Sequence, residues 1–289
     1  MKIAVYSLVH DDATLRIVSK IIAFFSEKKA HIQVEKALSS HFPKITSSSF
    51  ESHLDLDADT AVFFAVGGDG TVLRALNYVR ESKIPLIGIN TGRLGFLAIV
   101  QPDEIEACLQ DIVAHNFSTE ERSVLEIETN PAHPDLEAFP LALNEVSVAR
   151  ENTTSMVTIH TKVNGAYLNV YWADGLVLAT PTGSTGYSLS SGGPIIAPES
   201  KSLVLTPIAP HNLNARPLVV ADDVEIEMHV EGRGDSHLLS LDARLVSIPM
   251  QTSIRIKKAT SSMVFIRPNG HSFFDTLRNK LLWGQDKRN

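Results

Sequence analysis

Apolar residues in the first 120 positions follow two different periods. Short unbroken apolar runs, typical of strands covered on both faces of a parallel sheet, occur at 2–9, 31–35, 61–66 and 85–90. Apolar residues at helical spacing lie between and after them, at 12–29, from Thr71 onward and at 102–116. The polar, Ser-rich residues 44–59 predict a loop. Strands that alternate with helices predict an N-terminal doubly wound α/β domain over residues 1–120, with ligands at the carboxyl ends of its strands.

The chain changes character near residue 120. Strand-like segments now follow one another directly, at 124–129, 141–149, 156–163, 166–172, 176–179, 202–208, 224–230 and 253–256. They predict a C-terminal, β-sandwich-like domain over residues 121–265. The tail, residues 266–289, contains a closing helix with Phe273, Leu277 and Leu281 at helical spacing. We expect this helix to dock back on the α/β domain.

Composition narrows the class of protein. A length of 289 residues suits one large domain or two ordinary ones, and the formal net charge of −7 argues against a general nucleic-acid binder. The single cysteine, Cys108, leaves no intrachain disulfide and fits a reducing compartment. The N-terminus lacks the features of a signal peptide, and no apolar run has the length of a membrane helix. We therefore expect a cytoplasmic protein without a membrane partner.

A glycine-rich turn follows the strand at 61–66. Gly67, Gly68 and Gly70 remove the Cβ atoms that would keep a ligand off the backbone, and glycine permits positive φ. Because Thr71 then opens a helix, the turn predicts an anion-binding site at a helix N-terminus. Asp69 would repel an anion unless it handles a metal ion or a proton. The alternative is an ordinary turn in which Asp69 caps the helix.

Three further stretches carry candidate chemistry. Asn144-Glu145 places two polar residues inside a strand-like run, and Asp174-Gly175 on its own is typical of a hairpin turn. Residues 180–194 are Gly, Ser, Thr and Pro apart from Tyr187 and Leu189, and they lie inside the β-rich domain. Such a segment offers hydroxyl and amide donors with an aromatic face for a base. A flexible surface loop is the alternative.

Together these motifs resemble the NAD kinase family. The matching pieces are GGDGT at 67–71, LGFL at 94–97, NE at 144–145, DG at 174–175 with the block 180–194, and HNLNARP at 211–217. GGDGT is shared with diacylglycerol and sphingoid lipid kinases, whereas the segment 174–194 is more specific to NAD kinases. The resemblance implies transfer of the ATP γ-phosphate to the 2′-hydroxyl of the NAD adenosine ribose, which gives NADP. It also implies a divalent cation, Mg²⁺, held mainly through the ATP phosphates, and a homo-oligomer, either a tetramer or a dimer.

The resemblance also assigns roles to residues. Asp69 is the expected proton acceptor and therefore the catalytic residue. The residues expected to bind NAD or ATP are Gly67, Gly68, Gly70, Thr71, Arg74, Phe96, Asn144, Glu145, Asp174, Thr185, Gly186, Tyr187, Ser188, Leu189, Ser190 and Ala209. No metal ligands are expected from the protein. Trp172 stands where the family often has a basic residue, and Arg244 stands where Gln is common.

Two alternative functions remain open from the sequence. A lipid kinase that shares GGDGT would need an apolar acceptor pocket, whereas residues 180–193 offer hydroxyls and amides. A non-catalytic dinucleotide sensor would bind NAD but would not need Asp69. A Rossmann-type dehydrogenase is disfavoured because the chain has no GxGxxG motif.

Overall fold

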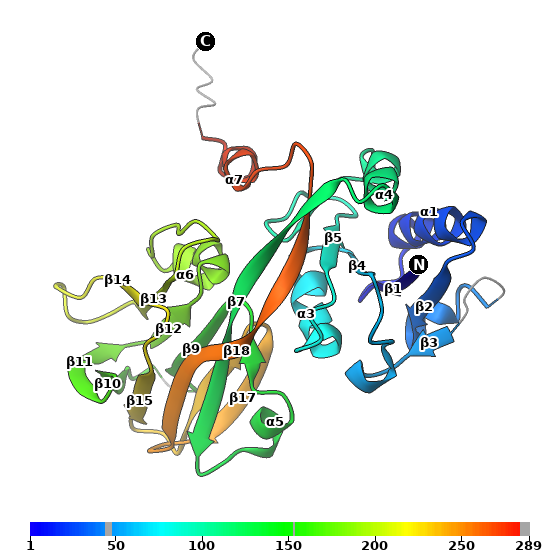
Figure 1. The fold of residues 1–289 in the computed structure, drawn as a ribbon. Coiled ribbons are helices and arrows are strands. Elements are labelled where there is room, and N and C mark those ends of the chain that lie inside the picture. The colour runs from blue at the N-terminus through cyan, green and yellow to red at the C-terminus, as the bar shows by residue number, and fades with distance from the viewer. Residues whose placement is uncertain (44–47, 153, 284–289) are drawn as a thin grey trace. The chain divides into compact units, whose positions relative to one another are not determined.

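The computed structural model describes residues 1–43, 48–152 and 154–283, and these divide into two units. Unit 1 comprises Met1–Glu121 together with Met263–Asn289, and unit 2 comprises Arg122–Ser262. Two long strands, β7 (Phe117–Asn130) and β18 (Ser253–Pro268), run from one unit into the other (Figure 1). We propose that the two units are the domains of the folded chain.

Unit 1 is built around parallel strands with helices on both faces. The strands, in the sheet order β5-β4-β1-β2-β3 with β6 beside β5, are β5 (Leu86–Ile89), β4 (Val62–Val66), β1 (Lys2–Tyr6), β2 (His31–Glu35), β3 (Ser48–Phe50) and β6 (Ala98–Val100). The helices are α1 (Asp12–Glu27), α2 (Lys36–Ser39), α3 (Asp69–Val79), α4 (Ile105–Val113) and α7 (Phe273–Leu281). The predicted doubly wound α/β fold is confirmed.

Side chains on β4 alternate between the two faces of this sheet. Val62, Phe64 and Val66 belong to a core that includes residues of α1 and α4. Phe63 points the other way, and its ring stacks on Tyr78 of α3. Figure 1 shows the same division, with α1 and α4 on one face and α3 on the other. Because both faces of β4 are covered, an unbroken apolar run is the sequence that it requires.

The loop predicted over residues 44–59 is wrong in part. Residues 44–47 lie outside the described residues, but β3 pairs with β2 and His53–Asp55 form a 3₁₀ helix. Gln33, buried on β2, donates from Nε2 to the Asp55 carbonyl at 3.0 Å and accepts from the Asp57 N–H at 3.0 Å. A distant side chain therefore orders a stretch whose own composition is that of a loop.

Unit 2 contains two antiparallel sheets that share one apolar core. One sheet has the order β14-β13-β12-β9-β16-β17, and the strands of the other in this unit have the order β11-β10-β15-β18. Their bounds are β9 (Glu145–Arg150), β10 (Val157–Val163), β11 (Ala166–Ala173), β12 (Gly175–Ala179), β13 (Ser202–Ile208), β14 (Leu218–Ala221), β15 (Ile226–Glu231), β16 (Ser236–Leu241) and β17 (Arg244–Pro249). The short strand β8 (Leu141–Ala142) pairs with β7, and α5 (Pro134–Ala138) lies between them in the chain. Residues from both sheets fill the core, which confirms the predicted sandwich-like domain.

Asp174-Gly175 is not a hairpin turn. β11 pairs with β10 in one sheet, whereas β12 pairs with β9 and β13 in the other. The dipeptide is therefore the point where the chain passes between sheets. A Cβ on Gly175 would lie 2.3 Å from the Val148 carbonyl oxygen, so the crossing needs glycine.

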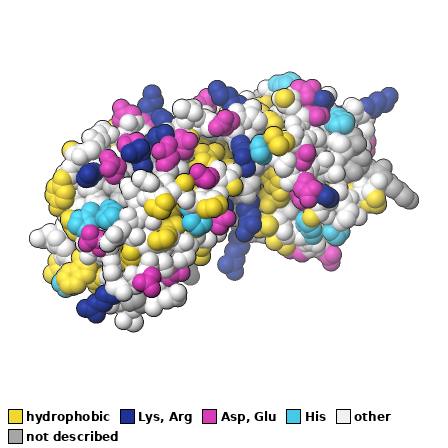
Figure 2. Space-filling model, turned by 90° about the horizontal axis from the view of Figure 1, so that it is seen from below, with side chains coloured by type: hydrophobic (Ala, Val, Ile, Leu, Met, Phe, Trp, Pro, Cys, Tyr) yellow, Lys and Arg dark blue, Asp and Glu magenta, His cyan; other side chains and the backbone are white. Residues whose placement is uncertain are grey.

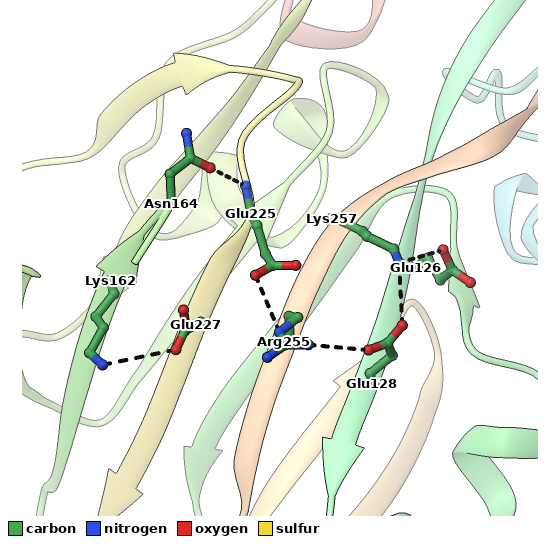
Figure 3. A network of polar contacts seen from close by, with 8 residues as sticks. All are labelled: Glu126, Glu128, Lys162, Asn164, Glu225, Glu227, Arg255 and Lys257. Atoms are coloured by element: carbon green, nitrogen blue, oxygen red, sulfur yellow. Dashed lines mark hydrogen bonds and ion pairs between the residues drawn. The ribbon is translucent and has the colours of Figure 1, made fainter. Parts of the chain in front are cut away.

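Charged side chains of both signs lie close together on the surface, as several places on the face in Figure 2 show. A network of this kind covers the outer side of unit 2 (Figure 3), formed by Glu126, Glu128, Lys162, Asn164, Glu225, Glu227, Arg255 and Lys257. Its ion pairs are 3.2–4.0 Å long, for example between Arg255 Nε and Glu225 Oε1 at 3.2 Å. Because these groups are solvent-exposed, each pair contributes at most about 1 kcal/mol, and the core dominates stability.

His237 generates a prediction about stability and pH. Its side chain is fully buried, and both ring nitrogens lack a hydrogen-bond partner among the described residues. Burial lowers the pKa of His237 from 6.5 to about 4, with Glu151 opposing the shift and His229 adding to it. As the pH falls from 6.5 to 4, the unfolded chain takes up a proton that the folded chain does not. The free energy of unfolding should therefore fall, by an amount on the order of 3 kcal/mol.

His237→Leu should remove this part of the pH dependence, so that the variant gains stability over the parent at pH 5 more than at pH 7.5. Urea unfolding of both proteins at the two pH values measures the difference. Equal pH dependence in the two proteins would contradict the assignment.

Candidate active site

The glycine turn lies at the carboxyl end of β4, and its three glycines differ in why they are needed. Gly67 has a φ of +151°, and a Cβ there would lie 2.3 Å from Thr71 Oγ1, so the fold itself requires this glycine. Gly68 and Gly70 have ordinary backbone conformations, and a Cβ on either would have no atom within 4 Å. Positive φ therefore explains only Gly67. The other two leave open space in front of α3.

Asp69 joins this turn to a second glycine turn. It is the first residue of α3, and its side chain does not cap the helix. Instead its carboxylate accepts the N–H groups of three consecutive residues, Phe96 at 2.8 Å, Leu97 at 2.9 Å and Ala98 at 2.9 Å. A Cβ on Gly95 would lie 1.9 Å from Asp69 Oδ1, so the chain passes close to the carboxylate only because residue 95 is glycine. The helix-cap alternative for Asp69 is wrong.

The other predicted residues of unit 1 lie around these turns. Thr71 is buried against Gly67, and Arg74 is exposed on α3. Phe96 is partly exposed, its ring centroid is 6.5 Å from that of Phe273 on α7, and Lys280 Nζ lies 5.6 Å from the Phe96 ring. The closing helix therefore contacts the turn that Asp69 holds.

Sequence reasoning missed Asn90, which follows β5 beside Gly67. The Gly67 N–H donates to the carbonyl of Ile89, the residue before Asn90, at 2.8 Å. Asn90 is buried; its Oδ1 accepts the Gly92 N–H at 2.5 Å, and its Nδ2 has no partner within the described ranges. The sequence did contain a signal for Asn90, because it is a polar residue that directly follows an apolar strand and precedes the second glycine turn.

In unit 2, Asn144 lies in the break between β8 and β9, and Glu145 is the first residue of β9. Asn144 Oδ1 and Glu145 Oε2 are buried, and neither has a hydrogen-bond partner among the residues that the structure describes. A Cβ on Gly186 would lie 3.0 Å from Glu145 Oε2 and 3.6 Å from Asn144 Nδ2. The two polar side chains thus end beside Gly186. Buried oxygens without donors are rare in folded proteins, which indicates a missing partner with hydroxyl or amino groups.

Residues 180–194 are ordered, so the flexible-loop alternative is wrong. The segment forms a 3₁₀ helix (Thr182–Thr185) and the short helix α6 (Tyr187–Ser190). Thr180 Oγ1 donates to the Leu143 carbonyl at 2.7 Å and accepts the Gly183 N–H at 3.1 Å. These bonds tie the segment to the residue before Asn144.

The hydroxyls of this segment are not equivalent. Ser188 is fully buried, and its Oγ is 2.8 Å from Thr206 Oγ1, so its side chain is committed to the fold. Thr185 Oγ1 donates to the Thr182 carbonyl at 3.1 Å. Tyr187 and Ser190 are exposed, whereas Gly186 and Leu189 are partly exposed. Gly186 therefore lies next to Asn144 and Glu145, whereas the Ser188 side chain is buried and hydrogen-bonded to Thr206.

Asp174 and Ala209 complete the predicted set in unit 2. Asp174 Oδ1 forms an ion pair with Arg150 Nε at 2.7 Å, with both side chains about one-third exposed. Ala209 is exposed and has a φ of +43°. Trp172 packs against His211, with ring centroids 4.3 Å apart. Asp174 thus has a partner within the protein, whereas Asn144 Oδ1 and Glu145 Oε2 have none among the described residues.

Glu145 has an unusual protonation state. Burial raises the pKa of its carboxyl to about 8, and the negative charge of Asp242 contributes to the rise, while the Tyr187 N–H opposes it. At neutral pH the carboxyl is therefore mainly protonated and can donate a hydrogen bond as well as accept one.

Within the described ranges, no three His, Cys, Asp or Glu side chains gather as metal ligands. In the same residues the structure has no helix with the length and apolar character needed to cross a membrane.

Comparison with known proteins gives a consistent result. Residues 8–117 match the family of the ATP-NAD kinase N-terminal domain, and residues 143–268 match that of the ATP-NAD kinase C-terminal domain. An NAD kinase of Christiangramia forsetii is 46% identical over 298 residues, and one of Flavobacterium johnsoniae is 47% identical over 294 residues, with all of each chain covered.

Two solved structures have a similar fold. The first is an NAD kinase from Archaeoglobus fulgidus in complex with ATP, 27% identical, with a TM-score of 0.75 over 98% of this chain and 99% of that one. The second is yeast NADH kinase complexed with NADH, 21% identical, with a TM-score of 0.88 over 100% of this chain and 89% of that one.

Proposed function

The chain belongs to the NAD kinase family, and from this premise we propose that it transfers the γ-phosphate of ATP to the 2′-hydroxyl of the NAD adenosine ribose, giving NADP. The observation that carries the proposal from the chain's own residues is a pair of buried oxygens, on Asn144 and Glu145 beside Gly186, for which the described part of the chain supplies no hydrogen-bond partner. A dinucleotide carries the ribose hydroxyls and amino groups that would supply the missing donors.

Asn144 and Glu145 have complementary roles in this proposal. Asn144 Oδ1 accepts from a hydroxyl or amino group of NAD. Glu145, mainly protonated at neutral pH, can also donate to an acceptor of the ligand. Asp174, which is paired with Arg150, and the exposed ring of Tyr187 contribute further contacts to NAD. The remaining residues proposed to lie close to NAD are Thr185, Gly186, Ser190 and Ala209. Because Ser188 Oγ forms a hydrogen bond with Thr206 Oγ1, we propose that Ser188 stabilises α6 and does not contact NAD with its side chain.

The glycine turn is the proposed site of the ATP phosphates. The open space at Gly68 and Gly70 lets phosphate oxygens approach the backbone at the N-terminus of α3, where N–H groups and the helix dipole favour negative charge. Arg74, exposed on α3, adds a positive charge. Asn90 Nδ2 is a buried donor that has no partner in the part of the chain that the structure describes, and it also suits an anionic ligand.

Mg²⁺ fits this arrangement as an ion carried by the phosphates. The Asp69 oxygens already accept three N–H groups, so the turn has no set of free carboxylates to hold the ion by itself. Phosphate oxygens are the hard ligands that Mg²⁺ prefers. When bound, the ion neutralises the negative charge that moves with the γ-phosphate.

Asp69 is the proposed proton acceptor for the ribose hydroxyl. Its position is fixed by the three N–H groups, so the carboxylate needs no reorganisation during the reaction. A carboxylate cannot ionise a ribose hydroxyl in advance. In a loose phosphoryl-transfer transition state it can instead accept the proton late, as the bond between the γ-phosphorus and the departing ADP breaks and the new bond to the ribose oxygen forms.

Two expectations from the sequence are also part of the proposal. The protein acts in the cytoplasm, which agrees with a single buried cysteine, and it assembles as a homo-oligomer, a tetramer or a dimer.

A non-catalytic sensor is the second candidate function, and the absence of turnover with intact NAD binding would favour it. A lipid kinase is disfavoured because the proposed acceptor groups are polar. Incubation with ATP, Mg²⁺ and either NAD or a diacylglycerol, followed by product detection, tests all three; no NADP formed would overturn the proposal.

Asp69→Asn should lower kcat by about a hundredfold or more, the scale of general-base removal, with the KM for NAD nearly unchanged. Asn can still accept the Leu97 and Ala98 N–H groups, so we expect only a modest fall in Tm. Steady-state kinetics and thermal unfolding measure both. Turnover within a few-fold of the parent would show that Asp69 only holds residues 96–98.

Gly70→Ala should fold well and still lose activity. A methyl group enters open space and gains helix propensity of up to about 1 kcal/mol, so Tm should not fall. The same methyl group would obstruct phosphates, and we expect the KM for ATP to rise about tenfold or more. Gly95→Ala is the contrast, because its Cβ would collide with Asp69 and should lower Tm. An unchanged KM for ATP in folded Gly70→Ala would mean that the phosphate turn is misassigned.

Asn144→Ala should raise the KM for NAD roughly tenfold to a hundredfold, corresponding to about 1–3 kcal/mol for ligand groups left unpaired. The KM for ATP should change much less, and Asp174→Ala should behave alike apart from a small loss of Tm through Arg150. Asn164→Ala is the matched control, because Asn164 accepts the Glu225 N–H at 2.8 Å in a turn of the same unit. That control should lower Tm and leave both KM values alone; the same pattern in Asn144→Ala would rule out a ligand role.

A further inference from the structure

We propose that Asp242, helped by Arg244 on the same hairpin, is a positioning residue that fixes Asn144 and Glu145 for substrate binding. This inference rests on the proposed function, in which Asn144 and Glu145 bind NAD. Asp242 itself contacts the backbone of those residues, and it is separated from them by nearly one hundred positions in the chain.

The contacts of Asp242 are numerous and specific. Its carboxylate accepts three consecutive N–H groups, from Leu143 at 2.9 Å, Asn144 at 2.7 Å and Glu145 at 3.1 Å. The Asp242 N–H donates in turn to the Glu145 carbonyl at 3.0 Å. Four hydrogen bonds therefore define the break between β8 and β9, and they set the direction in which the Asn144 and Glu145 side chains leave the backbone.

Asp242 occupies the two-residue connection between β16 and β17, where Leu241 pairs with Arg244. Its φ is +51°, a left-handed conformation that is uncommon for a residue with a side chain. Ser240 Oγ donates to the Asp242 carbonyl at 3.0 Å and supports the turn. The hairpin thus holds the carboxylate in a strained but well-supported position, as is typical of functional sites.

Arg244 fixes the segment that leads into the same break. Its guanidinium donates to the Phe139 carbonyl at 2.6 Å and to the Leu141 carbonyl, and its Cζ lies 4.4 Å from the centre of the Phe139 ring. The planar guanidinium can bond both carbonyls at once, which an ammonium group does less well. This explains Arg at a position where the family resemblance suggested Gln.

A buried carboxylate is costly unless it is fully hydrogen-bonded. Burial raises the pKa of Asp242, while the three N–H groups and Arg244 oppose the rise. The charge has a second effect, because it contributes to the raised pKa of Glu145. Asp242 therefore influences both the direction of the Glu145 side chain and the pKa of its carboxyl.

The test compares Asp242→Asn with Asp222→Asn. Asp222 is a buried carboxylate of the same unit, paired with Lys258 at 2.6 Å, and among the described residues no hydrogen bond or ion pair joins it to residues 143–145. In Asp242→Asn, the side-chain NH₂ group replaces a carboxylate oxygen and cannot accept hydrogen bonds from the backbone N–H groups that it faces. We expect the KM for NAD to rise about tenfold, with the KM for ATP within two- to threefold of the parent. We also expect the pH midpoint of the KM for NAD to shift downward, because Glu145 loses a negative neighbour. Asp222→Asn should lower Tm only.

Arg244→Lys is the second variant and keeps Asp242 in place. It should raise the KM for NAD by a smaller factor, about three- to fivefold, and it decides the question if Asp242→Asn does not fold. A folded Asp242→Asn with an unchanged KM for NAD and pH midpoint, or an unfolded Asp242→Asn together with an inert Arg244→Lys, would overturn the proposal. If Asn144→Ala still raises the KM for NAD in that case, the proposed function stands. If Asn144→Ala is also inert, the assignment of this NAD site fails first.

Discussion

One interaction recurs where the two units carry their candidate chemistry: a carboxylate accepts three consecutive main-chain N–H groups. Asp69 does this for residues 96–98, and Asp242 does it for residues 143–145. Charge-assisted hydrogen bonds of this kind are stronger than neutral ones. They give irregular segments the fixed geometry that strands and helices have by themselves.

The two carboxylates hold their segments for different purposes. Asp69 is placed at the N-terminus of α3, next to open backbone at Gly70, where negatively charged phosphates are favoured and the carboxylate can take a proton. Asp242 holds the backbone of Asn144 and Glu145, whose buried Oδ1 and Oε2 atoms lack a hydrogen-bond partner among the described residues. In the function that we propose, the first arrangement serves phosphoryl transfer and the second serves recognition of the acceptor.

Much of this was accessible from the sequence, because local patterns encode it. The apolar run of β4, the glycine turn after it and the polar pair at Asn144 all stand out by composition. The partners did not stand out, since they are distant in the chain. Gln33 orders a Ser-rich stretch, and Asp242 holds a turn nearly one hundred residues away. Pairing between remote positions leaves no periodic signal in a single sequence.

Residue-resolved amide hydrogen exchange on the ligand-free protein is the most direct measurement of the hydrogen bonds that Asp69 and Asp242 accept. The N–H groups of residues 96–98 and 143–145 lie for the most part outside strands and helices, and their hydrogen bonds go to the Asp69 and Asp242 carboxylates. Without these acceptors the six amides would exchange faster. We predict slow exchange at these six amides in the parent protein. In Asp242→Asn, protection should be lost selectively at Leu143, Asn144 and Glu145. Fast exchange at all six in the parent protein would contradict this prediction.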